Sequence, residues 1–159
     1  MRVDAQALRR DSSTTHPDDL ESVRRWVSDW GAEVAALELV AARRRFVADV
    51  VAFGTRADVV VGIDRLFDEQ WSRVWPTIED FRFEVGELEA QVSPDRLQAV
   101  AIVGWSSTGI HADGARFDRP GRATIVLQRS ATGAPWIGTH THFSLGLGVP
   151  QTSHGARLT

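Results

Sequence analysis

The sequence predicts an α+β domain in which helices pack on one face of a curved antiparallel sheet. Apolar residues recur at steps of three and four in the first part of the chain and at steps of two in the second part. The helical segments stand mostly before the strands instead of alternating with them, which is typical of the α+β class. Turn signals rich in Gly, Pro and Asp separate the strand-like segments.

Three helices are predicted. The first covers residues 17–35, where Pro17 and an acidic first turn favour a helix start. Its apolar stripe consists of Leu20, Val23, Val27, Trp30 and Val34. The second covers residues 38–46 and ends in three consecutive arginines, which suit a helix C-terminus. The third covers residues 64–75 and ends at Pro76.

The strands follow from β-rich or alternating segments. They are expected within residues 49–55, 78–93, 96–110, 121–130 and 135–145. The segment around residues 97–105 is apolar on both faces, so its outer face also needs cover. A homodimer that pairs sheet against sheet is the simplest expectation.

Length and composition limit the number of domains, the possible partners and the possible catalytic chemistry. The chain has 159 residues and suits one domain, with a flexible lead-in at 1–16, the domain at 17–148 and a polar tail at 149–159. A net charge of -3 implies no nucleic-acid or anionic-membrane partner. Cysteine and tyrosine are absent and all 18 basic residues are arginine, which excludes thiolate, phenol and Schiff-base lysine chemistry. Neither a signal peptide nor a membrane span is evident, so a cytoplasmic location is expected.

Four strings, "DVVAFGT", "QWSRVWPTIEDFRF", "GRATIVLQR" and "WIGTHTHFSL", resemble the SnoaL-like branch of the nuclear transport factor 2-like superfamily. The resemblance covers about residues 18–147. It implies a cone-shaped α+β shell with a pocket between helices and sheet. The superfamily includes isomerases, dehydratases, epoxide hydrolases, cyclases and non-catalytic binding or assembly modules, so the fold alone does not fix the function.

The family's known mechanisms do not transfer intact. The ketosteroid isomerase type places a general-base aspartate just after the first strand, where this chain has Gly54. The same type needs a tyrosine in its oxyanion hole, and this chain contains no tyrosine. The Asp–Arg–Asp set of limonene-epoxide hydrolase is imitated by Arg82 and Glu84, but Phe81 and Phe83 should take the core face of that strand.

His140 and His142 are the main candidate catalytic residues. Their spacing of two places both side chains on one face of a strand. The resemblance favours the concave face for them, where they would orient a ligand or act as a general base. The opposite assignment, with Thr141 and Phe143 inward, stays open, as does a purely structural hydrogen-bonding role. A metal site is not expected, because residues 145–147 offer no further ligand.

The remaining candidates would complete a pocket. The large aromatic residues proposed to wall it are Trp30, Phe53, Trp71 and Trp105. Arg122 is a candidate inward cation, with a surface ion pair as the alternative, and Asp49 is a candidate catalytic carboxylate, with helix capping as the alternative. The sequence therefore indicates a cofactor-free domain that binds a hydrophobic or polycyclic molecule. Lyase, isomerase or cyclase activity through the histidines is one interpretation, and a non-catalytic binding or assembly module is the other.

Overall fold

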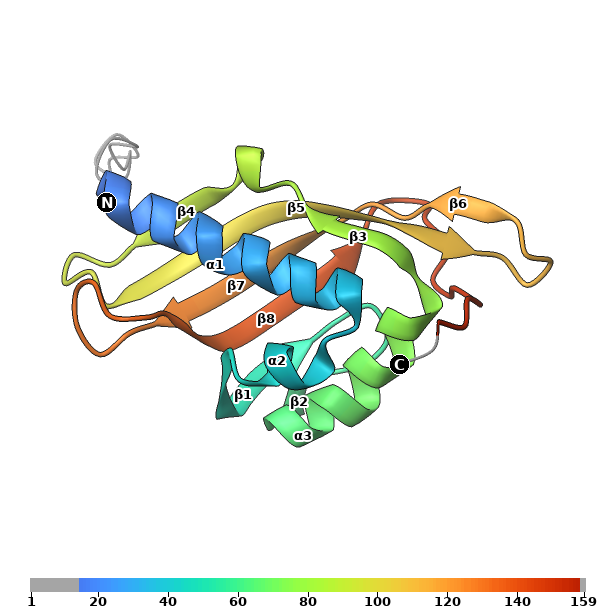
Figure 1. Ribbon diagram of the computed structural model, residues 1–159, viewed down its shortest axis with the longest axis horizontal. Coiled ribbons are helices and arrows are strands. Elements are labelled where there is room, and N and C mark those ends of the chain that lie inside the picture. Colours follow the sequence, from blue (N-terminus) through green and yellow to red (C-terminus); the bar gives the residue numbers. More distant parts are fainter. Residues whose placement is uncertain (1–14, 158–159) are drawn as a thin grey trace, which may run out of the picture.

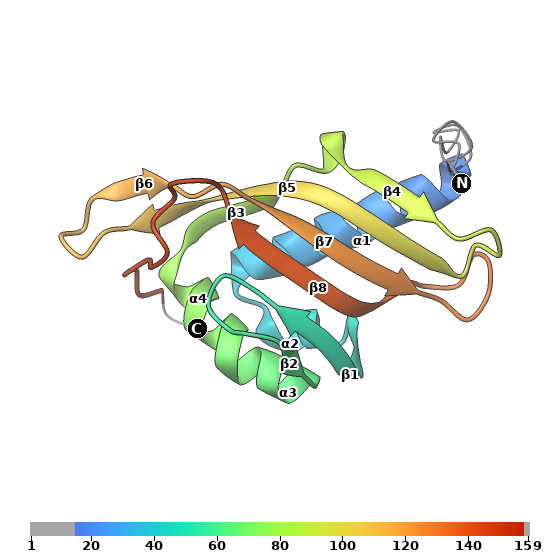
Figure 2. The same cartoon turned by 180° about the vertical axis from the view of Figure 1, so that it is seen from behind.

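A computed structural model describes residues 15–157 of the chain. Helix α1 (Pro17–Ala36) lies across the concave face of one curved sheet, and the shorter helices cover the lower end of the same face (Figure 1). None of the described helices lies on the opposite, convex face (Figure 2). The predicted α+β class is confirmed, and so is the cone-shaped arrangement of a curved sheet around the helices. Most of the predicted lead-in at 1–16 lies outside the described residues.

The helical elements follow the prediction closely at first. Helix α1 begins after His16, whose Nδ1 accepts the Asp18 N–H at 3.2 Å, and ends at Leu37 in a left-handed conformation with φ 58°. Helix α2 (Leu39–Arg43) is shorter than the predicted 38–46. The chain straightens into the first strand at Phe46, whose ring packs against α1 tryptophans at 5.5 and 5.0 Å.

The predicted helix at 64–75 is one continuous helical segment of changing pitch. It runs through α3 (Ile63–Leu66), the π-helical turn η1 (Phe67–Trp71), α4 (Ser72–Val74) and the 3₁₀ turn η2 (Trp75–Thr77). A π-helical turn fits one extra residue into the helix and often marks a functional position. Here Gln70 and Trp71 are buried within it.

Within residues 15–157, eight strands form the sheet. They are β1 (Phe46–Phe53), β2 (Val60–Val61), β3 (Glu79–Phe83), β4 (Glu89–Val92), β5 (Gln98–Ile110), β6 (Arg116–Asp118), β7 (Gly121–Gln128) and β8 (Ile137–Leu145). The order is β2-β1-β8-β7-β5-β3, and β4 and β6 also pair with β5. The expectation of a wholly antiparallel sheet is wrong at one pairing, because β1 and β8 run parallel. These strands are far apart in sequence, so no short turn connects them and the sequence did not indicate their relative direction.

The predicted strand at 78–93 is interrupted. The 3₁₀ turn η3 (Val85–Glu87) separates β3 from β4, and both strands pair with different parts of the long β5. The alternation of Phe81 and Phe83 was therefore informative only as far as β3 extends.

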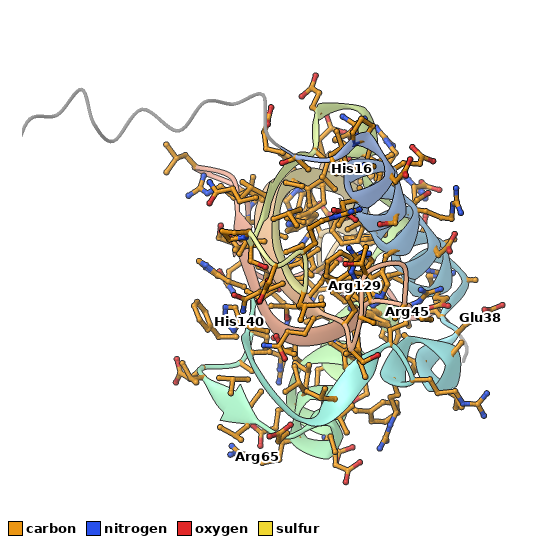
Figure 3. All side chains as sticks on the ribbon, turned by 90° about the vertical axis from the view of Figure 1, so that its left-hand side faces the viewer. His16, Glu38, Arg45, Arg65, Arg129 and His140 are labelled. Carbon is orange, nitrogen blue, oxygen red and sulfur yellow. The ribbon has the colours of Figure 1, made fainter. Side chains whose placement is uncertain are left out.

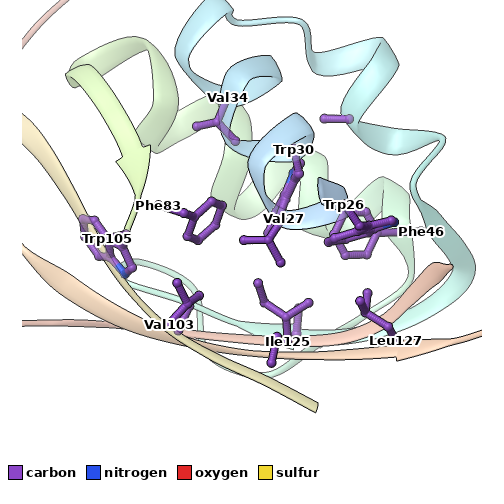
Figure 4. Close-up of a cluster of buried hydrophobic side chains, with 14 of the residues drawn as sticks. Trp26, Val27, Trp30, Val34, Phe46, Phe83, Val103, Trp105, Ile125 and Leu127 are labelled. Carbon is purple, nitrogen blue, oxygen red and sulfur yellow. The ribbon is translucent and has the colours of Figure 1, made fainter. Parts of the chain in front are cut away.

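The core lies between α1 and the concave face of β5, β7 and β8 (Figure 4). The inward residues of β5 and β7 include several alanines, which leave room for the indole rings of α1. These inward residues are Ala99, Ala101, Val103 and Trp105 on β5, and Ala123, Ile125 and Leu127 on β7.

The described part of the predicted polar tail packs back onto the domain. The His154 N–H donates to the Ile110 carbonyl at 2.8 Å, and the Arg157 N–H donates to the Pro76 carbonyl at 2.7 Å. Ser153 is buried, and its hydroxyl accepts the Ile110 N–H at 2.9 Å. This segment therefore lies beside the end of the sheet at which the site described below opens.

Candidate functional site

A narrow cavity with about 30 Å³ of free space lies between α1, the helical segment at 63–77 and the concave face of the sheet. Its lining is mainly aromatic and aliphatic. The lining residues are Trp30, Val34, Phe53, Gly54, Thr55, Leu66, Gln70, Trp71, Val74, Trp75, Ile78, Phe81, Trp105, Arg119, Thr141 and Phe143. Of the predicted aromatic residues, Trp30, Trp71 and Trp105 wall this cavity, whereas Phe53 borders it at the end of β1 and packs its ring on His142 at 4.2 Å.

The aromatic rings pack on one another around this space. Trp71 and Trp75 stack with ring centroids 4.6 Å apart and an interplanar angle of 19°. Phe143 meets Trp30 edge to face at 5.6 Å and lies 6.0 Å from Trp105. Mutual packing fixes the orientation of each ring, so the cavity presents flat apolar surfaces of defined direction.

Gln70 shapes the loop that follows β1. Its side-chain oxygen accepts the N–H groups of Arg56 at 3.1 Å and Ala57 at 2.8 Å, and its Nε2 donates to the Thr55 hydroxyl at 3.3 Å. Gly54 allows this approach, because a Cβ there would lie 2.7 Å from the Gln70 Nε2. The π-helical turn and the glycine together bring Thr55 to the cavity wall.

Arg119 is the charged residue of the cavity lining. It lies between β6 and β7, where its backbone pairs with Ser107 through hydrogen bonds of 2.9 and 3.1 Å. The residue is 2% exposed, and its Cζ lies 5.5 Å from the Trp105 ring centroid. Burial lowers the pKa of Arg119 to about 10, which leaves the guanidinium protonated at neutral pH.

A second, more polar pocket adjoins the cavity. It is lined by Thr55, Arg56, Arg73, Val74, Thr77, Arg119, Gln151, Thr152 and Ser153. Thr55, Val74 and Arg119 border both spaces, so they mark the boundary between them. The polar pocket joins the apolar cavity to the part of the surface where the C-terminal segment lies.

The predicted placement of His140 and His142 on the concave face is wrong. Thr141 and Phe143 line the cavity, because the large Phe143 ring packs into the aromatic core of α1 and β5. His140 lies on the side of the sheet away from α1 (Figure 3), with its Nδ1 2.7 Å from the Val51 carbonyl oxygen. The His142 ring lies 4.2 Å from the Phe53 ring.

Asp49 and Arg122 also lie outside the cavity. Asp49 is exposed on β1, within the irregular stretch between Phe46 and Val51. Arg122 is exposed opposite Ser144 on the convex face, since Ala123 takes the inward position of β7. The predicted catalytic residues therefore form no common site with the aromatic lining.

Arg119, Gln70 and Thr55 were not identified from the sequence. Arg119 precedes Pro120 and Gly121, and this combination indicates a turn. The inward alternation of β7 extends backward from Ala123 in steps of two to Arg119, and this pattern was the available signal. Gln70 gave no signal, because a π-helical turn breaks the 3.6-residue period.

Residues 15–157 contain no group of three or more His, Asp or Glu side chains arranged to hold a metal ion. None of the described helices is both long and apolar enough to cross a membrane.

No family model matches the sequence, and no curated protein matches it. Solved structures do. A ketosteroid isomerase-like protein from Erwinia carotovora atroseptica aligns with a TM-score of 0.68 at 18% identity, covering 82% of this chain and 98% of that one. A nuclear transport factor 2-like superfamily protein from Salmonella enterica aligns at 0.66 and 15% identity, covering 82% and 96%. The association domain of C. elegans CaMKII aligns at 0.59 and 10% identity, covering 78% and 93%. The chain therefore has the nuclear transport factor 2-like, or ketosteroid isomerase-like, fold expected from its sequence.

Proposed function

We propose that this chain binds a small organic molecule with a flat apolar body in the cavity beneath α1. The observation that carries the proposal is the set of aromatic rings that pack on one another around the cavity. Mainly apolar walls with a few polar groups are typical of small-molecule sites. Because the free space is only about 30 Å³, the surrounding rings have to move apart to admit a ligand. The adjoining polar pocket provides a path from the surface.

The chemistry of the lining favours binding over turnover. The polar side chains at the cavity are Thr55, Gln70, Arg119 and Thr141. Hydroxyl, amide and guanidinium groups orient a ligand, but they do not readily accept a proton at neutral pH. His140 and His142 lie on the opposite face of β8 from the cavity, so we assign them no role at a ligand bound there.

Blocking the boundary between the two pockets tests the proposal. Val74 borders both spaces, so Val74→Phe should fill the path with a larger side chain. Val40, 66% exposed on α2, provides the matched control Val40→Phe. We expect a naphthalene-based probe, followed by tryptophan fluorescence, to bind the wild type and the control equally and to bind Val74→Phe at least tenfold more weakly. Equal binding to all three proteins would show that the probe does not use this cavity.

We also propose that two copies pair through the convex face of the sheet. Adjacent strands place Val100, Val126, His140 and Val51 in one cross-strand row, and Ile102, Thr124, His142 and Phe53 in the next. Ile102 is 46% exposed and Val51 39% exposed in the single chain. An exposed apolar face of this kind commonly marks an interface, and one of the similar structures is an association domain.

Light scattering tests the pairing. The wild type should give about twice the 17.5 kDa mass of the chain at micromolar concentration. Ile102→Glu should give the single-chain mass, because a charge at the centre of an apolar interface lacks a partner. Val40→Glu, on helix α2, should not change the mass. A monomeric wild type would contradict the proposal.

A further inference from the structure

Arg119 is a fully buried cation without a carboxylate partner among residues 15–157. We propose that the cavity is a site for a small aromatic or polycyclic carboxylic acid, whose carboxylate pairs with Arg119 while its apolar body lies between the tryptophans. This inference rests on the proposed binding function and specifies the chemical class of the ligand.

The other buried arginine shows what Arg119 lacks. Arg129 is also buried, and its Nη2 donates to the Asp19 carboxylate at 2.6 Å while its Nε donates to the Arg96 carbonyl at 2.8 Å. This is the ordinary arrangement, because a buried charge is costly unless it is paired and hydrogen-bonded. Among the described residues, Arg119 Nε is buried with no hydrogen-bond partner, and Nη2 has only the Thr55 hydroxyl at 3.4 Å.

The unused donors converge on one place. Thr55 Oγ1 already accepts from Gln70 Nε2 and lies within reach of Arg119 Nη2, so its own O–H proton has no acceptor in the described part of the chain. Thr55 and Arg119 both stand at the boundary between the apolar cavity and the polar pocket. A planar carboxylate placed there would accept from the guanidinium and from the hydroxyl together.

The surroundings favour a single negative charge joined to an apolar body. The arginines Arg56 and Arg73 line the polar pocket beside Arg119, and no Asp or Glu is among the lining residues described. One buried cation balances one carboxylate, and the indole of Trp105 beneath Arg119 holds the guanidinium plane in position. On the cavity side, the stacked Trp71 and Trp75 rings provide the surface for an aromatic body.

Paired probes that differ only in charge test the inference. Naphthalene-2-carboxylate and naphthalene-2-carboxamide have the same ring system and nearly the same shape. Benzoate and benzamide form a smaller pair. Titration calorimetry at pH 7 with the full chain should give at least tenfold tighter binding for the acid of at least one pair. Arg119→Gln should remove that difference while leaving the affinity for the amide within about twofold.

Arg44→Gln is the charge-matched control, since it removes one positive charge from an exposed residue outside both pockets. It should preserve the preference for the acid. Equal binding of acid and amide to the wild type would overturn the inference while leaving the proposed cavity function intact. An unchanged preference in Arg119→Gln would also overturn it, and binding of neither pair would contradict the proposed function itself. Circular dichroism and thermal unfolding of Arg119→Gln establish that the variant is folded.

Discussion

Asp19 and Arg129 form a buried ion pair, with Asp19 Oδ1 2.6 Å from Arg129 Nη2, that joins the first turn of α1 to the end of β7. Arg96 adds a second, bidentate partner to the same carboxylate at 2.6 and 3.0 Å. The hydrogen bond from Arg96 is the largest cause that lowers the pKa of Asp19 to about 2. This cluster fixes one end of α1 over the sheet, and with it the aromatic residues of the helix.

Asp19→Asn should therefore destabilise the fold by about 3 kcal/mol, because it leaves Arg129 as an uncompensated buried charge. Urea unfolding at pH 7 measures this change. Asp18→Asn, at the exposed neighbouring position, is the control and should change stability by less than about 1 kcal/mol. Similar losses in the two variants would mean that the buried pair has no special role.

The same carboxylate predicts an acid dependence. The folded-state pKa of Asp19, about 2, lies below the ordinary value of 3.8, so the contribution of Asp19 to stability is complete above about pH 5 and declines as the pH falls toward 2. The loss should amount to about 2 kcal/mol of unfolding free energy. Asp19→Asn should show a correspondingly flatter stability profile between pH 5 and pH 2. A parallel profile in variant and wild type would contradict the assignment.

Arg119 should behave in the opposite way in the ligand-free protein. Burial lowers its pKa, so the folded state disfavours the charge, and removal of the charge should stabilise the fold. Arg119→Met should raise the free energy of unfolding by about 1–3 kcal/mol, whereas Arg129→Met should lower it. Thermal and urea unfolding compare the two variants. A destabilised Arg119→Met would indicate that Arg119 has a structural role.

Substitutions on the two faces of β8 should affect different properties, namely ligand binding on the concave face and dimer formation on the convex face. Phe143→Leu should weaken binding of a naphthalene probe, because Phe143 packs against Trp30 at the cavity wall. His142→Ala should leave that binding unchanged and weaken the dimer, because His142 lies against Phe53 on the convex face. Probe titration and light scattering on both variants make the comparison. A loss of probe binding in His142→Ala would contradict this assignment and indicate that His142 contributes to the binding site.

Gly121 should tolerate no side chain. A Cβ there would lie 2.2 Å from Trp105 Cζ2 and 2.3 Å from the Ser144 carbonyl oxygen. Gly121→Ala should cost about 1–3 kcal/mol and displace the Trp105 ring, which near-ultraviolet circular dichroism detects. Gly86→Ala is the control, because a Cβ at Gly86 meets nothing within 4 Å. Equal stability of the two variants would contradict the packing described.

The sequence predicted the helices and most strands well because their apolar periods are strong. The stripe of α1 fixed that helix to within about one residue of Pro17–Ala36. The face of β8 was harder to assign, because both alternating sets of "THTHFS" mix polar with aromatic residues. Only the packing of Phe143 against other elements decides between them, and this tertiary contact has no local sequence signal.

The candidate site was predicted unevenly for a similar reason. Large aromatic residues such as Trp30 and Trp71 are buried wherever a core forms, so their place at the cavity followed from size and spacing. Arg119 depends on the continuation of the β7 alternation through a turn and on the absence of a nearby carboxylate among the described residues. The second condition belongs to the folded structure alone.

A crystal structure of the protein with naphthalene-2-carboxylate tests the central claim most directly. The account predicts the naphthalene rings between Trp71 and Trp105, with a carboxylate oxygen within about 3 Å of Arg119 Nε, the usual length of such a hydrogen bond. A naphthalene bound on the convex face, or a carboxylate held by Arg56 and Arg73 with Arg119 Nε still unpaired, would contradict it.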